Sequence, residues 1–265
     1  MSNSLPAPAV VVGVDGSRAA QQAALWAIDE AVSRDIPMRL VYVVDPQDAT
    51  TAHACEARLA GARTALADAH RSVGATGAPV KIETDILCGR PLTKLLEESR
   101  SAAMICVGSI GLNHARHGGT PVATALAGSA RCPVAVIRQP ARRSAAPKVT
   151  TVLAEADNGM VLRHAFDEAR LREATLRALW VYRGEDSQDD GDGTRSAQAQ
   201  LTRRLARWTR LYPDVRAEPA IVRDSVEQYL RANPEAGQLL VTEGHTAERV
   251  CNAGHSVLAI RCGNL

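Results

Sequence analysis

Two segments in the first half of the chain place residues that could bind a phosphorylated ligand. The first, Val11-Val12-Gly13-Val14-Asp15-Gly16-Ser17, puts an acid and small residues directly after a short apolar run. The second contains Gly108-Ser109-Ile110-Gly111 and then Gly118-Gly119-Thr120. Glycines let backbone amides approach phosphate oxygens closely, and a helix start adds unpaired N–H groups and a favourable dipole. A carboxylate such as Asp15 could accept hydrogen bonds from a ribose or, through a metal ion, face a phosphate.

The same two segments also suit ordinary tight turns, so the glycines alone leave the function open. They form neither a Walker A loop, because no Gly-Lys-Ser/Thr follows, nor the closely spaced GxGxxG of a dinucleotide site. No serine or histidine is paired in sequence as nucleophile and base, and the six cysteines form no CxxC pair. We therefore expect neither a catalytic centre nor a metal site.

The elements that would position these segments alternate along the chain. Short apolar, β-branched runs are separated by longer segments of helical periodicity, which is the pattern of a parallel sheet built from βαβ units. In open sheets of this kind, ligands bind at the carboxyl ends of the strands. The predicted strands of the first half are Ala9–Val14, Met38–Val44, Val80–Leu87, Met104–Gly108 and Pro133–Ile137, with helices at Arg18–Arg34, Ala54–Val73, Leu92–Ser101 and Val122–Ala130.

The second half of the chain repeats the first. Ala27-Ile28-Asp29-Glu30-Ala31 recurs as Ala165-Phe166-Asp167-Glu168-Ala169, and Cys132-Pro133-Val134-Ala135-Val136-Ile137-Arg138 as His255-Ser256-Val257-Leu258-Ala259-Ile260-Arg261. Such matches in the same order indicate a duplication. We predict a first domain over 1–138, a proline-bounded linker over 139–148 and a second domain over 149–265. The strands of the second domain are predicted at Val149–Ala154, Leu176–Tyr182, Val215–Val222, Gln238–Thr242 and Ser256–Arg261.

The composition is that of a globular protein and excludes several other classes. The net charge is +2, far from the concentrated basic character of a nucleic-acid binder. No apolar run approaches the roughly 20 residues of a membrane span, and the first residues do not resemble a signal peptide. We therefore expect a cytoplasmic protein that binds neither nucleic acid nor membrane.

Taken together, the motifs resemble the universal stress protein family. The resemblance rests on Val-Gly-Val-Asp-Gly-Ser near the N-terminus, Gly89-Arg90-Pro91, the Gly-x-x-Gly at Gly108, and Arg-Cys-Pro-Val-Ala-Val before the last strand. It covers nearly all of both copies. It implies two Rossmann-like α/β domains of the HUP type, each a five-stranded parallel sheet of order 3-2-1-4-5 flanked by helices. It also implies ATP, alone or with magnesium, as the ligand of the first copy. The implied site residues are Gly13, Asp15, Val43, Val44, Gly108, Ser109, Gly111, Gly119, Thr120 and Val122.

The chain departs from the family pattern at two places. The phosphate loop of the ATP-binding branch reads Gly-x2-Gly-x9-Gly-Ser/Thr, whereas here Thr120-Pro121 falls where the final pair belongs, and Pro121 lacks an N–H. In the second copy an ungapped alignment places Leu153 opposite Asp15. The stretch from Thr242 to His255, matched to Gly108–Cys132, is eleven residues shorter. We therefore predict that the second copy has lost the site and serves as a scaffold.

These motifs and departures are compatible with two functions. The first is a regulatory protein that responds to nucleotide bound in the first copy and passes that state to a protein partner, without strong catalysis. The second is an interaction module that binds no nucleotide, which the Thr120-Pro121 departure favours. In either case we expect a homodimer, by resemblance to the family, and no enzyme of the related adenylating group.

Overall fold

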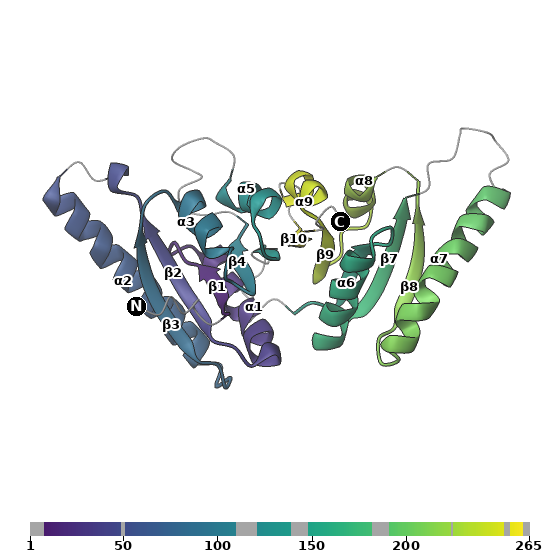
Figure 1. The fold of residues 1–265 in the computed structure, drawn as a ribbon, viewed down its shortest axis with the longest axis horizontal. Helices are drawn as coiled ribbons and strands as arrows, with labels where there is room; N and C mark the ends of the chain where they lie inside the picture. Colours follow the sequence, from purple (N-terminus) through teal and green to yellow (C-terminus); the bar gives the residue numbers. More distant parts are fainter. Residues whose placement is uncertain are drawn as a thin grey trace. The chain divides into compact units, whose positions relative to one another are not determined.

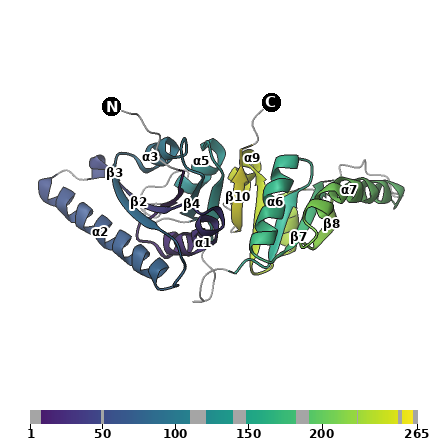
Figure 2. The same cartoon turned by 60° about the horizontal axis from the view of Figure 1, so that its bottom comes forward.

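A computed structural model describes residues 8–48, 51–109, 121–138, 148–181, 191–223, 225–251 and 255–261. The chain divides into two compact units, Met1–Pro147 and Lys148–Leu265. Each can be followed by colour in Figure 1 and, turned, in Figure 2. Of the predicted linker 139–148, all but Lys148 lies outside the described residues.

The first unit is a parallel sheet of order β3-β2-β1-β4-β5 with helices on both faces. Helix α1 packs beside α2, and α3 packs beside α5. The strands are β1 (Val10–Gly13), β2 (Met38–Val44), β3 (Ile82–Cys88), β4 (Met104–Gly108) and β5 (Val134–Ile137). The helices are α1 (Arg18–Arg34), a short 3-10 turn at Pro46–Asp48, α2 (Ala52–Gly74), α3 (Pro91–Glu98) and α5 (Val122–Ser129).

The sequence explains this layering directly. Strands β1, β4 and β5 are almost continuous apolar runs because helices cover both of their faces, and Val10–Val12 are fully buried. Helix α1 begins at Ser17, whose hydroxyl oxygen accepts a hydrogen bond from the Ala20 N–H. It ends at Asp35, which adopts a left-handed conformation with φ of 50°. These caps fix both ends of the helix that covers the middle of the sheet.

The second unit repeats the same order, β8-β7-β6-β9-β10, again with all strands parallel. The predicted fold class is therefore confirmed for both copies. The strands are β6 (Thr151–Glu155), β7 (Thr175–Val181), β8 (Ala217–Val222), β9 (Gln238–Glu243) and β10 (Ser256–Ile260). The helices are α6 (Gly159–Leu171), α7 (Gly191–Leu211), α8 (Val226–Ala232) and α9 (Gly244–Val250).

Strand register matches the two units residue by residue and corrects the ungapped alignment. Val10 pairs with Met38 of β2 and Met104 of β4, as Val152 pairs with the corresponding residues of β7 and β9. Val10 therefore corresponds to Val152, and Leu153 corresponds to Val11 rather than to Asp15. The ungapped alignment failed because α6 has 13 residues where α1 has 17, which shifts the strand before the helix by four residues.

The same register identifies the counterparts of the candidate site residues. Gly13 pairs with Val41 as Glu155 pairs with Leu179, and the next residue in each copy donates its N–H to that partner's carbonyl at 2.8 Å. Gly108 pairs with Ile137 as Glu243 pairs with Ile260. The counterparts are therefore Glu155 for Gly13, Asp157 for Asp15 and Glu243 for Gly108; Thr242, matched to Gly108 from the sequence, corresponds to Val107.

Candidate functional site

The carboxyl ends of β1 and β4 meet in the middle of the first unit's sheet. From β1 the chain moves outward to β2 and β3, then returns to β4 on the other side of β1, so a topological switch point lies between β1 and β4. Because Val12 pairs with Cys106, the two strands end side by side, at Gly13 and Gly108. Both glycines therefore lie where doubly wound sheets bind their ligands.

The loop after β1 is a tight turn that also starts α1. Asp15 Oδ1 accepts a hydrogen bond from the Ser17 N–H at 2.9 Å, and the Ser17 hydroxyl oxygen accepts one from the Ala20 N–H at 3.1 Å. Gly16 between them has φ of 83°, a conformation that a side chain would strain. The half-buried Asp15 carboxylate is thereby held at the switch point.

The two strand-end glycines differ in the atoms that an added Cβ would meet. A Cβ on Gly13 would lie 3.0 Å from Val107 Cγ1, a side-chain atom. A Cβ on Gly108 would lie 2.6 Å from the carbonyl carbon of Ala19 and 2.7 Å from the N of Ala20, both in the backbone of α1. Gly108 is therefore required by the packing of α1 on β4 whether or not a ligand binds, whereas a Cβ at Gly13 would meet the side chains of Val107 and Leu95 and no backbone.

The end of β2 offers a backbone donor and acceptor beside the switch point. The Val14 N–H donates to the Val41 carbonyl at 2.8 Å, just past the end of β1. Val43 lies two residues further along β2, so its N–H and C=O point to the same side, beyond the last residue of β1. Within the described ranges neither group makes a backbone hydrogen bond. A donor and an acceptor on one residue match the edge of an adenine, which presents a ring nitrogen beside an amino group.

Val44 and its neighbours occupy the adjoining part of the edge. Val44 is buried, and its carbonyl accepts a hydrogen bond from the Gly89 N–H at 2.9 Å, so its backbone is engaged within the fold. Arg90 then starts α3, and its guanidinium donates to Gln47 Oε1 at 3.3 Å. Arg90 was not among the site residues predicted from the sequence, yet its guanidinium lies beside Gln47, just past the end of β2.

The start of α5 is the last described part of the predicted phosphate loop. Pro121 is the N-cap residue and no side chain caps the helix. A proline there removes one of the unpaired N–H groups, and those of the first helical turn remain. Val122 at this turn is 37% exposed. Ser109 donates its N–H to the Ile137 carbonyl at 2.9 Å, which leaves its hydroxyl for a ligand. Gly111, Gly119 and Thr120 lie outside the described residues.

At the equivalent edge of the second unit, side chains bridge the switch point between β6 and β9. Glu155 Oε2 accepts a hydrogen bond from the Thr242 hydroxyl, and Glu243 Oε1 accepts one from the Asn158 side-chain amide. His245 Nδ1 lies 3.3 Å from Glu243 Oε2. Burial raises the pKa of the Glu155 carboxyl above its ordinary value, and the hydrogen bond from Thr242 opposes this rise. Two carboxylates thus stand where the first unit has glycines.

The rest of the second edge is also closed. Helix α9 begins immediately after β9, with Glu243 as its N-cap residue, so no loop separates strand from helix. Arg204 of α7 donates to the Asp157 carbonyl and places its guanidinium carbon 5.7 Å from the centroid of the Trp180 ring. Asp157 is the counterpart of Asp15, but its backbone here is bound by the chain's own arginine.

Together, the fold and the two edges define a tandem of doubly wound α/β units in which glycines end the central strands of the first unit and hydrogen-bonded glutamates end those of the second. Residues 8–138 match the model of the universal stress protein family. The chain is 57% identical over 269 residues to the universal stress protein Rv3134c of Mycobacterium tuberculosis strain H37Rv, with 100% of both chains covered. It is 43% identical over 258 residues to Rv2028c of the same strain, covering 94% of this chain and 90% of that protein. The chain belongs to the universal stress protein family.

A solved universal stress protein from Archaeoglobus fulgidus has the same fold. The match covers 97% of both chains with a TM-score of 0.70. Its sequence identity of 13% limits this likeness to the arrangement of helices and strands. No helix in the described part of the chain is long and apolar enough to cross a membrane.

Proposed function

We propose that this chain is a regulatory protein that binds one ATP molecule, at the carboxyl edge of the first unit only. The observation that carries the proposal is the contrast between equivalent positions. Gly13 and Gly108 add no charge at the ends of β1 and β4, whereas Glu155 and Glu243 place two carboxylates at the equivalent strand ends of the second unit. A carboxylate repels a phosphate and would remain unpaired against it, at a cost in free energy.

The contacts of the first edge support adenine nucleotide in particular. The N–H and C=O of Val43 suit the adenine edge, and Asp15 is held where it can accept from ribose hydroxyls. The uncapped start of α5 points unpaired N–H groups toward an anion. Arg90 adds a positive charge next to β2. The described residues contain no group of three or more metal-ligating side chains, so a magnesium ion would arrive with the nucleotide and meet Asp15 as its protein carboxylate.

The proposed role is regulatory rather than catalytic, for the following reason. Within the described residues, nothing at the first edge combines a general base with a cation placed for phosphoryl transfer. Bound ATP would instead contact the β1–α1 turn and the start of α5, and a protein partner would distinguish the bound from the free state. In this proposal the chain acts by conformation, as a homodimer with a further protein, and no catalytic step is assigned to it.

Titration calorimetry with ATP tests the proposal. We expect one site per chain, weakened by Asp15→Ala by about 1–3 kcal/mol through loss of a charge-assisted hydrogen bond. Asp157→Ala, the matched change in the second unit, should leave binding unaltered. Gly111→Leu should abolish binding, because a side chain would fill space that the phosphates need. Two sites per chain, or equal sensitivity to the two aspartate changes, would contradict the proposal.

A nucleotide-free interaction module is the second candidate. It is favoured by Pro121 at the N-cap of α5 and by the engagement of the Ser109 N–H in the sheet. On this alternative the wild-type chain releases no heat with ATP and retains no nucleotide on purification. Thr120→Gly combined with Pro121→Ser would then restore affinity by returning a pliable residue and an amide. If that double variant also binds nothing, the site has been placed wrongly.

A further inference from the structure

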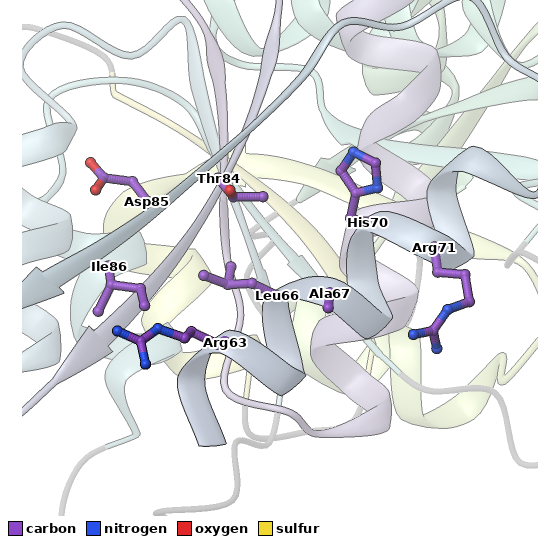
Figure 3. Close-up of a pocket in the computed structure, with 8 residues that line it drawn as sticks. All are labelled: Arg63, Leu66, Ala67, His70, Arg71, Thr84, Asp85 and Ile86. Atoms are coloured by element: carbon purple, nitrogen blue, oxygen red, sulfur yellow. The ribbon is translucent and has the colours of Figure 1, made fainter. Parts of the chain in front are cut away.

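The outer edge of the first sheet carries a groove that lies away from the proposed nucleotide site. It has a volume of about 810 Å³ and runs between α2 and the edge strand β3. Figure 3 shows its two walls, with Arg63, Leu66, His70 and Arg71 on the helix and Thr84 and Ile86 on the strand. No described strand pairs with the outer side of β3.

The outward N–H and C=O groups of β3 pair with no strand in the described part of the chain. The Lys81 carbonyl accepts from β2, and the Gly89 N–H donates to β2, both at 2.9 Å. Alternate residues counted from these two therefore face β2, and the residues between them face outward. Thr84 and Ile86 are among the latter, so their N–H and C=O groups point away from the sheet. These are the groups with which an added strand would pair.

The second unit shows that the equivalent edge is blocked. Strand register equates Thr84 with Pro219 of β8, since Thr84 pairs with Leu40 as Pro219 pairs with Ala178. The Arg216 carbonyl accepts from β7, so Pro219 also faces outward. A proline at an outward position removes a donor from the open edge while sparing the ladder inside the sheet, and so discourages strand addition. The two copies differ at the residue that decides whether the edge can pair.

The charges along the groove select the occupant. Arg63 makes no ion pair with the described residues, and Arg71, paired with Asp68 at 2.8 Å, keeps three-quarters of its side chain exposed. These arginines are two helical turns apart, about 12 Å, which spans roughly four residues of an extended strand. Acidic side chains on alternate residues of an added strand would therefore meet both. The carboxylate of Asp85, the acid on this wall, lies 3.9 Å from Arg39.

We propose that this groove binds an extended segment of a partner protein that carries acidic side chains at alternate positions and adds as a strand to β3. Main-chain hydrogen bonds to Thr84 and Ile86 supply the affinity, and Arg63 and Arg71 select the acidic side chains. The surface is independent of the nucleotide site, which lies at the carboxyl ends of β1 and β4.

The test uses the full-length protein and two capped eight-residue peptides, four Thr-Glu repeats and four Thr-Lys repeats. Fluorescence anisotropy should show the glutamate peptide binding at least about tenfold more tightly than the lysine peptide. Arg63→Glu should largely remove this difference, because Arg71 then remains as the single positive charge of the pair. Thr84→Pro should lower the affinity for the glutamate peptide by about tenfold or more. Thr84→Val keeps the N–H and should leave this affinity unchanged. Pro219→Thr serves as the matched control and should leave binding at β3 unchanged.

Amide hydrogen exchange gives an independent readout that does not depend on a variant folding. The peptide should slow exchange at the amides of Thr84 and Ile86, with little change at Asp85 and Leu87, which already donate to β2. The proposal is overturned if neither peptide binds or if Thr84→Pro binds as well as wild type. It is also overturned if inorganic phosphate at matched ionic strength displaces the peptide, which would indicate a small-anion site. Self-association lost in Thr84→Pro, without peptide binding, would instead assign the edge to a second copy of the chain.

Discussion

The two carboxyl edges of this chain have the same scaffold and opposite chemistry. Strand order and register are the same, yet glycines end the central strands of the first unit and glutamates end those of the second. A glycine adds no charge or acceptor atom at a strand end, whereas a glutamate brings both. The second unit satisfies these atoms internally, through Thr242 and Asn158. A duplicated fold can therefore carry different chemistry at its two edges while keeping the same core, because the difference lies in the last residues of the central strands.

The largest effect is expected from transferring the second unit's residue to the first. Gly13→Glu should lower ATP affinity by a hundredfold or more, about 3 kcal/mol, because a carboxylate would face the phosphates. Gly13→Gln is the matched control, with the same size and no charge, and should lose less affinity. Calorimetry on both variants measures the difference. Equal losses would mean that bulk rather than charge separates the two edges.

The sequence alone predicts the features that depend on local patterns and misses those that depend on tertiary structure. The alternation of apolar runs and helical periodicity predicted the core of every strand. The order of the strands in each sheet was implied by the family resemblance. Glu155 was not recognised as the counterpart of Gly13, and Thr242 rather than Glu243 was matched to Gly108, because both assignments need the register of β6 and β9. Val43 was predicted as a site residue, but its free backbone groups follow from β1 ending before β2, a tertiary fact. Pro219 likewise gains its meaning only from the side toward which it faces.

The next comparison concerns packing rather than ligand. Gly108→Ala should destabilise the first unit by about 1–3 kcal/mol, because the new Cβ would overlap the backbone of α1, which cannot move as a side chain can. Gly13→Ala should cost less, since its Cβ would meet side chains alone, those of Val107 and Leu95. Urea unfolding of the two variants checks the order. If Gly13→Ala proves the more damaging, Gly108 is kept for its ligand and not for its packing.

The smallest effect concerns the pH dependence of the second unit and tests how the charge of Glu155 affects the stability of that unit. Burial raises the pKa of the Glu155 carboxyl in the folded protein above its unfolded value. The folded state therefore binds this proton more tightly than the unfolded state does, so the ionised group costs stability at neutral pH. That cost disappears as the pH falls through the raised pKa.

Glu155→Gln keeps an oxygen that can accept from the Thr242 hydroxyl and removes the charge. It should raise the unfolding temperature slightly at pH 7, with the advantage shrinking toward acidic pH. Thermal unfolding of both proteins from pH 4 to pH 8 measures this, with Glu243→Gln as the control at a carboxylate whose amide partner is Asn158. A variant that is less stable than wild type at pH 7 would show that the charge of Glu155 is itself part of what holds the second edge together.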